Sequence, residues 1–462
     1  MTNSSEHGGG KATDSIQQRL TDYACGLSYE NLTPRAIHAA KARIIDTLGA
    51  LIGGFFGESC RVARRLAAAM PNPDGATVIG TRMKTTPDMA AFANAVASCH
   101  ADITDSYHWP GSSHGHPSNL LTPVLAAAEH VQASGRDFIT SIVLAYEIYL
   151  RFSNAVRSPG FDNTNFACVG TAAAAGKLFG LTPGQLAHGI SMAVVPNVIL
   201  KQSKTGMFYT VRAGQAGRAG VFAALLARAG MEGPHLPYEG KAGWCAHVAG
   251  KRFVLDTWGG NGTRFKILDT QIKNRPAVGN MISSILAAEK VAPLNIRDVL
   301  QVRVEVFDYA LEEYEASGRN PQSRESAYYA IPYLVAATLT EGTVTLRTYN
   351  RAHLTDSKLR ALMDKIEVIE NPEFTRAYNA DPQQHRTRVT VMTGGGGQLV
   401  GEAGGDEDDL SAPRSDAQIE DKFRGLTEDV LGAKQVNRIL DRLWHLDDMK
   451  NVAEIPPAFV LD

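Results

Sequence analysis

The 462-residue chain lacks the features that mark several large classes of protein. Its 46 basic and 48 acidic residues leave a formal charge of -2, which offers no broad electrostatic field for nucleic acid or for an anionic membrane. A run of about 18 apolar residues, as a membrane span requires, does not occur, and the polar, Gly-rich start lacks the apolar core of a signal peptide. We therefore expect a cytoplasmic protein whose partner is a small molecule.

Clustered thiols and a phosphate-binding loop are also missing. The five cysteines lie far apart and form no Cys-x-x-Cys motif: Cys25, Cys60, Cys99, Cys168 and Cys245. Their spacing suits a reducing compartment and offers no thiolate cluster for an iron–sulfur dehydratase. The glycines at 394–397 are followed by neither GK[ST] nor a helical pattern, so they predict a hairpin tip. We expect side chains to carry any proton chemistry.

A dense polar stretch at 99–121, CHADITDSYHWPGSSHGHPSNLL, lies between two Ala-rich apolar segments. Its polar residues include two aspartates, four histidines, a serine and a tyrosine: Asp102, Asp105, His100, His108, His114, His116, Ser106 and Tyr107. Proton-exchanging groups on a turn-rich connection between helices suit general acid/base chemistry. A weaker alternative is a metal-dependent enzyme that uses Asp102, His108, His114 and His116 as ligands.

Hydrophobic periodicity divides the chain into two kinds of structure. Residues 15–268 are predicted to form Ala-rich helices, one of them starting at Thr33-Pro34 and ending at Gly53-Gly54. Strand patterns then alternate with helical ones, and helical patterns return at 416–430 and 434–446. The strands are expected at 302–307, 366–369 and 388–392, and the intervening helices at 276–291, 325–339 and 357–363. The prediction is a mainly α protein with a disordered leader (1–14), a discontinuous all-helical domain (15–268 and 406–462) and a smaller α+β domain (269–405).

Several motifs, in order along nearly the whole chain, resemble the MmgE/PrpD family. They are HADITDSY…GHPSN, GFDNTNFACVGTAAAAGKLFGLTPGQLAHGISMA, KTGMFYTVRAGQAGRAGVFAALLARAGMEGP, IKNRPA and AIPYLVAATLTEG. That family includes 2-methylcitrate dehydratase, cis-aconitate decarboxylase and iminodisuccinate epimerase. The resemblance implies that the α+β domain is a lid over a site between the domains. The junctions between the two kinds of structure, near residues 268 and 405, are the expected hinges. It also implies a homodimer and proton transfer beside a carboxylate of a small di- or tricarboxylate, without cofactor or metal.

The resemblance also assigns candidate site residues. The catalytic candidates are Asp102, His116, Lys273 and Tyr333, and the substrate-binding candidates are Lys204, Arg212, Ser106 and Asn163. Buried lysine or arginine side chains can pair with substrate carboxylates, and an arginine can do so with two parallel hydrogen bonds. A histidine can take or give a proton near neutral pH. The aspartate could orient that histidine or act as a base, and the tyrosine could donate to an oxyanion or a hydroxyl.

Three positions depart from the family pattern, in which many relatives carry histidine. Here they are Asn163, the pair Tyr328-Tyr329 and the region of Gly279-Asn280. Asparagine and tyrosine can donate hydrogen bonds, but they do not exchange protons near pH 7 unless their pKa values are strongly shifted. Either His116 carries more of the chemistry, helped by His114 or His108, or the chain catalyses a different reaction from the named members.

Three functions therefore stay open. The first is a hydro-lyase acting on a 2-methylcitrate-like hydroxy acid, and the second is a decarboxylase or epimerase that uses the same cationic clamp. Removing water, carbon dioxide or a proton from similar acids needs nearly the same residue types, so the sequence does not separate these reactions. The third is a non-catalytic relative that binds carboxylates, which the missing histidines suggest.

Overall fold

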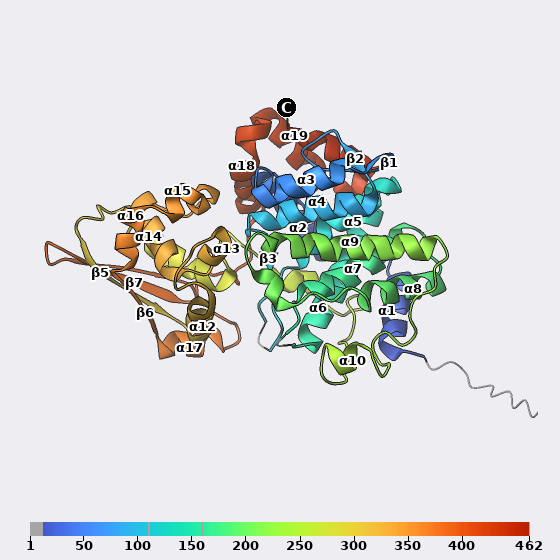
Figure 1. Ribbon diagram of the computed structural model, residues 1–462, viewed down its shortest axis with the longest axis horizontal. Coiled ribbons are helices and arrows are strands. Elements are labelled where there is room, and N and C mark those ends of the chain that lie inside the picture. The colour runs from blue at the N-terminus through green and yellow to red at the C-terminus, as the bar shows by residue number, and fades with distance from the viewer. Residues whose placement is uncertain (1–12, 110, 159, 462) are drawn as a thin grey trace, which may run out of the picture.

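The computed structural model describes residues 13–109, 111–158 and 160–461 and has a mainly α-helical fold with small β-sheets (Figure 1). The N-terminal part contains α1 (Ser15–Gly26), α2 (Pro34–Gly54), α3 (Glu58–Ala68), α4 (Pro87–His100), α5 (Leu121–His130), α6 (Gly135–Ala155), α7 (Thr164–Leu178), α8 (Pro183–Val194), α9 (Phe208–Arg228) and α10 (Trp244–His247). Its short strands are β1 (Pro71–Thr77), β2 (Lys84–Thr85), β3 (Asp105–Ser106) and β4 (Gln271–Ile272). The predicted mainly α character is confirmed.

Local sequence signals explain several helix boundaries. The hydroxyl of Thr33 accepts a hydrogen bond from the backbone of Ala36, Pro34 takes the first helical position, and α2 ends at Gly54, as predicted. The helix expected over 325–339 is instead two helices, α13 (Arg324–Ala327) and α14 (Ile331–Glu341). Pro332 has no backbone N–H and so can stand only in the first turn of a helix, which separates the two.

The second part of the chain surrounds a four-stranded sheet in the order β6-β5-β7-β8. Its strands are β5 (Val299–Val306), β6 (Ile366–Glu370), β7 (Thr387–Thr393) and β8 (Gln398–Ala403). The β5–β6 pair is parallel, with Val302 opposite Ile366, and the other pairs are antiparallel. Its other helices are α11 (Ile282–Glu289), α12 (Asp308–Ser317), α15 (Arg351–Leu354), α16 (Ser357–Met363) and α17 (Pro372–Tyr378). Val302, Val304 and Val306 are buried whereas the alternating Gln301 and Arg303 are exposed, so one face of β5 is covered.

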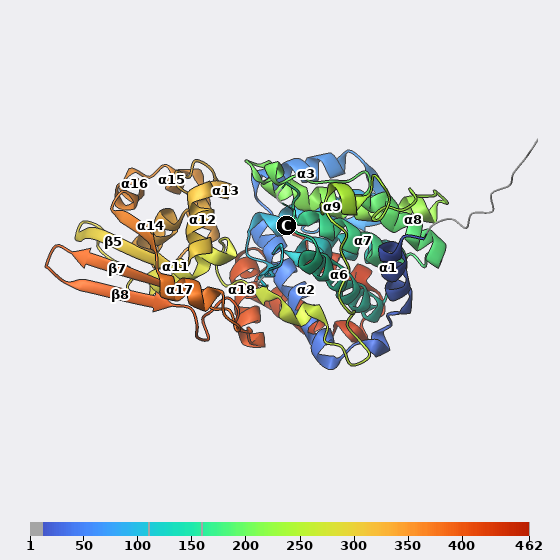
Figure 2. The same cartoon turned by 90° about the horizontal axis from the view of Figure 1, so that it is seen from below.

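Buried apolar residues form two large clusters. One contains residues from 16–272 together with residues from 419–459, and the other contains residues from 277–410 only. The two C-terminal helices, α18 (Asp416–Leu431) and α19 (Ala433–Trp444), pack on α2 and lie with the N-terminal helices (Figures 1 and 2). The sheet and its helices lie to one side of them in both views.

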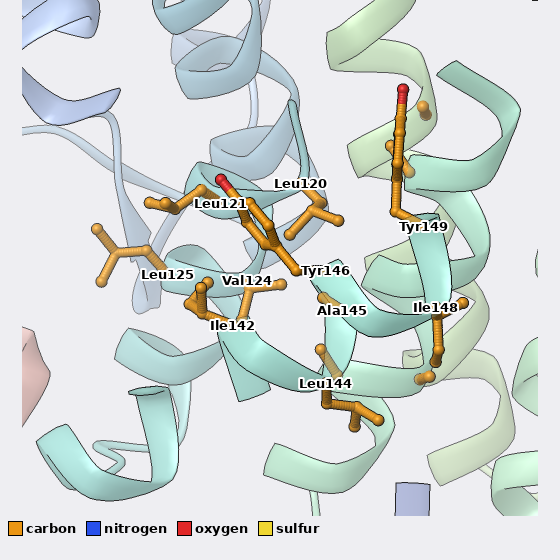
Figure 3. Close-up of a cluster of buried hydrophobic side chains, with 14 of the residues drawn as sticks. Leu120, Leu121, Val124, Leu125, Ile142, Leu144, Ala145, Tyr146, Ile148 and Tyr149 are labelled. Atoms are coloured by element: carbon orange, nitrogen blue, oxygen red, sulfur yellow. The ribbon is translucent and has the colours of Figure 1, made fainter. Parts of the chain in front are cut away.

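The helix that supports the polar stretch is α6, which is apolar on most faces. Figure 3 shows Ile142, Ala145 and Tyr146 of α6 beside the leucines at the start of α5. Burying a leucine or isoleucine side chain in this cluster contributes on the order of 1.5–3 kcal/mol. The rings of Tyr146 and Tyr149 carry hydroxyls from this core to the polar stretch, where they bond to Asp105 and to the backbone of His116.

Two expectations concern the N-terminus and membranes. Residues 1–12 of the predicted leader lie outside the described residues, but Asp14, which we placed in it, is buried and ordered by contacts. Its carboxylate caps α1 and accepts hydrogen bonds from the backbones of Tyr238 and Glu239 at 2.8 and 2.9 Å, so the leader prediction was wrong at this residue. In the described part of the chain, no helix combines the length and apolar character that crossing a membrane requires.

Candidate active site

The polar stretch forms an irregular connection between α4 and α5. Strand β3 within it pairs with β4, which brings the segment containing Lys273 alongside. Asp102 and His114 have φ angles of 45° and 54°, in the left-handed region that residues with a Cβ seldom adopt. Each costs on the order of 1–3 kcal/mol, and such strain concentrates at functional sites. Gly115 is required here, because a Cβ would collide with the Tyr149 hydroxyl.

A cavity of about 570 Å³ lies against this stretch. Its wall comes from the polar stretch, from the segments Val156 to Phe166 and Lys201 to Arg212, from Val248, and from residues between 278 and 329, in the part of the chain that contains the four-stranded sheet. Four predicted site residues line it: His116, Asn163, Lys204 and Arg212. Four predicted site residues do not: Asp102, Ser106, Lys273 and Tyr333.

Basic side chains outnumber acidic ones in the cavity wall. The basic residues are Arg157, Lys201, Lys204 and Arg212, and the acidic residues are Asp162 and Glu313. Asp162 lies between two of these cations, 3.3 Å from the Lys204 Nζ and 3.4 Å from the Arg212 Nε. Burial alone would raise the pKa of Asp162, but Lys204, Arg212 and hydrogen bonds from Thr164 outweigh it and hold that pKa below its usual range. The remaining positive charge suits an anionic ligand.

His116 is held as a neutral imidazole. Its Nδ1 lies 3.0 Å from the carbonyl oxygen of Asp105, and because a carbonyl can only accept, Nδ1 carries the proton. Its backbone N–H donates to the Tyr149 hydroxyl at 3.1 Å. Burial and the positive charge of Lys273 lower the pKa of His116 well below 6.5. Its Nε2 forms no hydrogen bond with the described residues, so it is a base with a free lone pair.

Three further histidines surround this corner of the site. The ring of His108 lies 4.9 Å from that of His114 and 5.8 Å from that of His385, between ring centroids. Burial, helped by Arg157, lowers the pKa of His114 to about 4. His385 comes from the second cluster's part of the chain, and its Nδ1 lies 3.1 Å from the Asp409 carboxylate. His385 was not a candidate from the sequence, because a lone histidine before a strand belongs to no motif.

Asp102 and Lys273 form a buried ion pair behind the cavity wall. The Lys273 Nζ donates to Oδ1 of Asp102 at 3.1 Å and to the carbonyl oxygens of Asp102 and Ala277, each at 3.0 Å. All three ammonium hydrogens are therefore engaged. Lys273 was expected to bind a substrate carboxylate. In this arrangement it has no ammonium hydrogen left to donate to a substrate.

Two other candidates have surroundings of their own. The Tyr333 hydroxyl donates to the carbonyl oxygen of Thr348, and its ring lies in the second apolar cluster. Ser106 is buried in β3, and its Oγ has no partner among the described residues. Both side chains were predicted to contact the substrate directly. Neither lines the cavity, so the cavity does not support that prediction.

The positions where relatives carry histidine have identifiable contacts here. The Asn163 side chain donates to the carbonyls of Ser113 and His114, both at 3.2 Å. The Tyr328 hydroxyl donates to the His100 carbonyl at 3.0 Å, whereas Tyr329 lines the cavity. Asn280 donates to Glu313 at 2.7 Å. Neither Glu313 nor Asp162 was a candidate from the sequence, although Asp162 stands inside the GFDNTN motif beside Asn163.

The described residues offer no set of metal ligands. No group of three or more histidine, cysteine, aspartate or glutamate side chains in residues 13–109, 111–158 and 160–461 is placed to hold a metal ion. The ligand set that the sequence left open, which joins Asp102 to three histidines, is not assembled, because Asp102 pairs with Lys273 instead.

The fold is mainly α-helical, and its cavity has a basic wall that contains several histidines. Family models match most of the chain: residues 18–255 match the MmgE/PrpD N-terminal domain and residues 278–446 match the MmgE/PrpD C-terminal domain. The chain belongs to the MmgE/PrpD family, as the sequence motifs predicted.

Named relatives are similar over most of their length. Human cis-aconitate decarboxylase is 24% identical over 460 residues, which cover 95% of this chain and 93% of the relative. The 2-methylcitrate dehydratase of Salmonella typhi is 26% identical, with 79% of each chain covered. The 2-methylcitrate dehydratase of Cupriavidus necator is 25% identical, with 84% of each covered.

Proposed function

We propose that this protein is a cofactor-independent lyase that removes water from a small di- or tricarboxylic hydroxy acid, in the manner of a 2-methylcitrate dehydratase. The observation that carries the proposal is the free Nε2 of a neutral His116 in a cavity whose wall has more basic than acidic groups. A neutral histidine can remove the proton beside a carboxylate, and fixed cations stabilise the negative charge that develops. The names of the relatives support the same class of reaction.

Each side chain of the site has a proposed role. His116 is the base, and Lys204 and Arg212 bind the substrate carboxylates. Asn163 uses its Nδ2 on two backbone carbonyls, so its Oδ1 is the atom proposed to accept a hydrogen bond from the substrate. The remaining candidates act through the backbone: the Asp102–Lys273 pair fixes the polar stretch, Ser106 sits in the strand that carries it, and Tyr333 packs the opposite wall.

A decarboxylase or an epimerase is the alternative within the same site. The human relative is named a cis-aconitate decarboxylase and covers nearly all of this chain. Loss of carbon dioxide would use the same clamp and would need a proton donor to the resulting carbanion. A non-catalytic carboxylate-binding protein is the remaining candidate, and it is favoured by the asparagine and tyrosines at the histidine positions.

We also propose the domain organisation expected from the sequence: a helical domain from residues 15–268 and 406–462, and a lid from residues 269–405 that moves over the cavity. The separate apolar clusters support this division. A homodimer is proposed through exposed apolar side chains near the starts of α3 and α9. Phe56 is 60% exposed and Phe208 is 52% exposed, and the two helices are joined by a 2.9 Å hydrogen bond from Thr210 to Ser59.

Nuclear magnetic resonance in deuterated buffer tests the reaction. The substrates are 2-methylcitrate, citrate, cis-aconitate and tartrate, each incubated with the purified protein. The proposal predicts loss of water from a hydroxy acid. Loss of carbon dioxide or deuterium incorporation alone would move the assignment to the alternatives, and thermal stabilisation by these acids without any conversion would indicate a binding protein.

A further inference from the structure

Glu313 is, with Asp162, one of the two acidic residues that line the cavity. It lies on α12, in the part of the chain that contains the four-stranded sheet, and lines the cavity together with His116, Lys204 and Arg212. Its Oε2 accepts a 2.7 Å hydrogen bond from Nδ2 of Asn280. No basic group in the described part of the chain lies within 4.0 Å of this carboxyl, and its Oε1 has no hydrogen-bond partner there.

The two carboxyl groups of the cavity wall have opposite environments. Asp162 has two cations within 3.4 Å, so its charged form is stabilised. Glu313 is partly buried, and it has a single neutral donor and no ion pair. Burial raises the pKa of Glu313, and the hydrogen bond from Asn280 and the more distant charge of Lys204 reverse only part of this. The neutral, proton-bearing form is therefore favoured at Glu313 and disfavoured at Asp162.

Three other donors in the cavity wall, His114, Tyr309 and Tyr329, are less suited to giving a proton near pH 7. The pKa of His114 falls to about 4, so this ring is already neutral there. Burial raises the pKa values of Tyr309 and Tyr329, so their hydroxyls hold their protons more tightly than an ordinary tyrosine does. A carboxylic acid is a much stronger donor than either.

We propose that Glu313 is the catalytic acid of this site, which gives its proton to the hydroxyl that leaves the substrate. The inference rests on the proposed dehydratase function. It also assigns a role to Asn280, which stands where relatives carry histidine and here holds the carboxyl by its amide. Asn280 is thus a positioning residue, and the acid function lies on the neighbouring helix.

The step balances with the groups present. His116 Nε2 removes the proton beside the carboxylate, and the electrons of that C–H bond form the carbon–carbon double bond. The C–O bond to the hydroxyl breaks with its electron pair on oxygen, and the Glu313 proton converts this oxygen to water. His116 ends as an imidazolium and Glu313 as a carboxylate. Proton exchange with solvent then restores both groups, and no oxidation or reduction occurs.

The experiment compares Glu313→Gln and Glu313→Asp with Glu315→Gln as the matched control, which removes an exposed carboxylate from the same helix. We expect kcat for water loss to fall at least ~100-fold in Glu313→Gln, the low end for loss of an acid catalyst. We expect a smaller fall in Glu313→Asp, which keeps a proton donor, and a change below about twofold in Glu315→Gln. The alkaline fall of kcat that reflects ionisation of Glu313 is expected to disappear in Glu313→Gln.

A second substrate separates acid catalysis from a structural role. In an analogue with chloride in place of the hydroxyl, the leaving group needs no proton, so Glu313→Gln should eliminate chloride within about tenfold of the unmodified protein. Equal losses on both substrates, or an unchanged kcat for water loss, would overturn the assignment of Glu313 and leave the dehydratase proposal standing. Failure of the unmodified protein to remove water from any of the acids would overturn both proposals.

Discussion

The Nζ of Lys273 lies 3.1 Å from the Oδ1 of Asp102, and both side chains are buried. The pair joins the polar stretch to the segment that enters the second part of the chain, across 171 residues of sequence. It therefore fixes the backbone on which the cavity's histidines stand. Its effect on stability and its effect on catalysis can be measured separately.

Removing the cation alone should destabilise the protein more than removing both charges. Lys273→Met leaves the buried Asp102 carboxylate without its partner, which costs about 3–5 kcal/mol. The double variant Asp102→Asn/Lys273→Met should recover part of that loss. Urea denaturation of the two single variants and the double variant measures this. A double variant as unstable as the sum of the singles would mean that the two groups are not coupled.

The same pair should matter for turnover. Lys273→Ala is expected to lower kcat at least ~100-fold, because the polar stretch that carries His116 loses its anchor. Circular dichroism should still show the helical fold below the melting temperature. Near-normal kcat in a folded Lys273→Ala protein would remove this residue from the proposed site.

His116 should act as a base over an unusually wide pH range. His116→Ala is expected to lower kcat at least ~100-fold. In the unmodified protein the pKa of His116 lies well below 6.5, because burial and Lys273 disfavour the imidazolium. The unprotonated base therefore persists as pH falls from 8 to 6, so protonation of His116 should not lower activity there, and the acid limb of the profile should lie below this range. A pH–rate profile with an acid limb centred near 6.5 would show that His116 titrates normally or is not the base.

Arg212 should determine affinity for the acidic substrate. Arg212→Lys keeps the charge but removes the planar fork that can bind a carboxylate with two hydrogen bonds. We expect KM to rise about tenfold, which corresponds to about 1.4 kcal/mol, with a smaller effect on kcat. Steady-state kinetics measures both, and Lys241→Met, which removes an exposed lysine away from the cavity wall, is the control. An unchanged KM would place the substrate elsewhere.

Much of the fold follows from local sequence, whereas the site depends on packing between distant segments. The Thr33-Pro34 start of α2 and the alternating valines of β5 have signals within a few residues. Four of the candidate residues that the motifs predicted do line the cavity. Lys273 lies behind the wall because of an ion pair with a residue far away in sequence. Glu313 stands in an acidic helical segment that reads as solvent-exposed, so no local pattern marks it.

The link between the sheet and α18 should lose stability in acid through one carboxylate. Asp409 is buried and accepts five hydrogen bonds, two from Ser411, two from His385 and one from the backbone of Gly405. Burial alone would raise its pKa, but these bonds and the nearby His385 hold it below the usual range. The predicted hinge near residue 405 is thus anchored by a charged group.

A lowered pKa in the folded state fixes the sign of this dependence. The stabilisation by Asp409 is complete above the unfolded-state pKa of about 3.9 and is lost as pH falls below it. Asp409→Asn should therefore lower the free energy of unfolding by about 1.5–3 kcal/mol at pH 7 and by less at pH 3. Denaturation at both pH values measures this, with the exposed Glu407→Gln as the control. An equal loss at pH 3 and pH 7 would mean that the packing of this side chain matters and its ionised form does not.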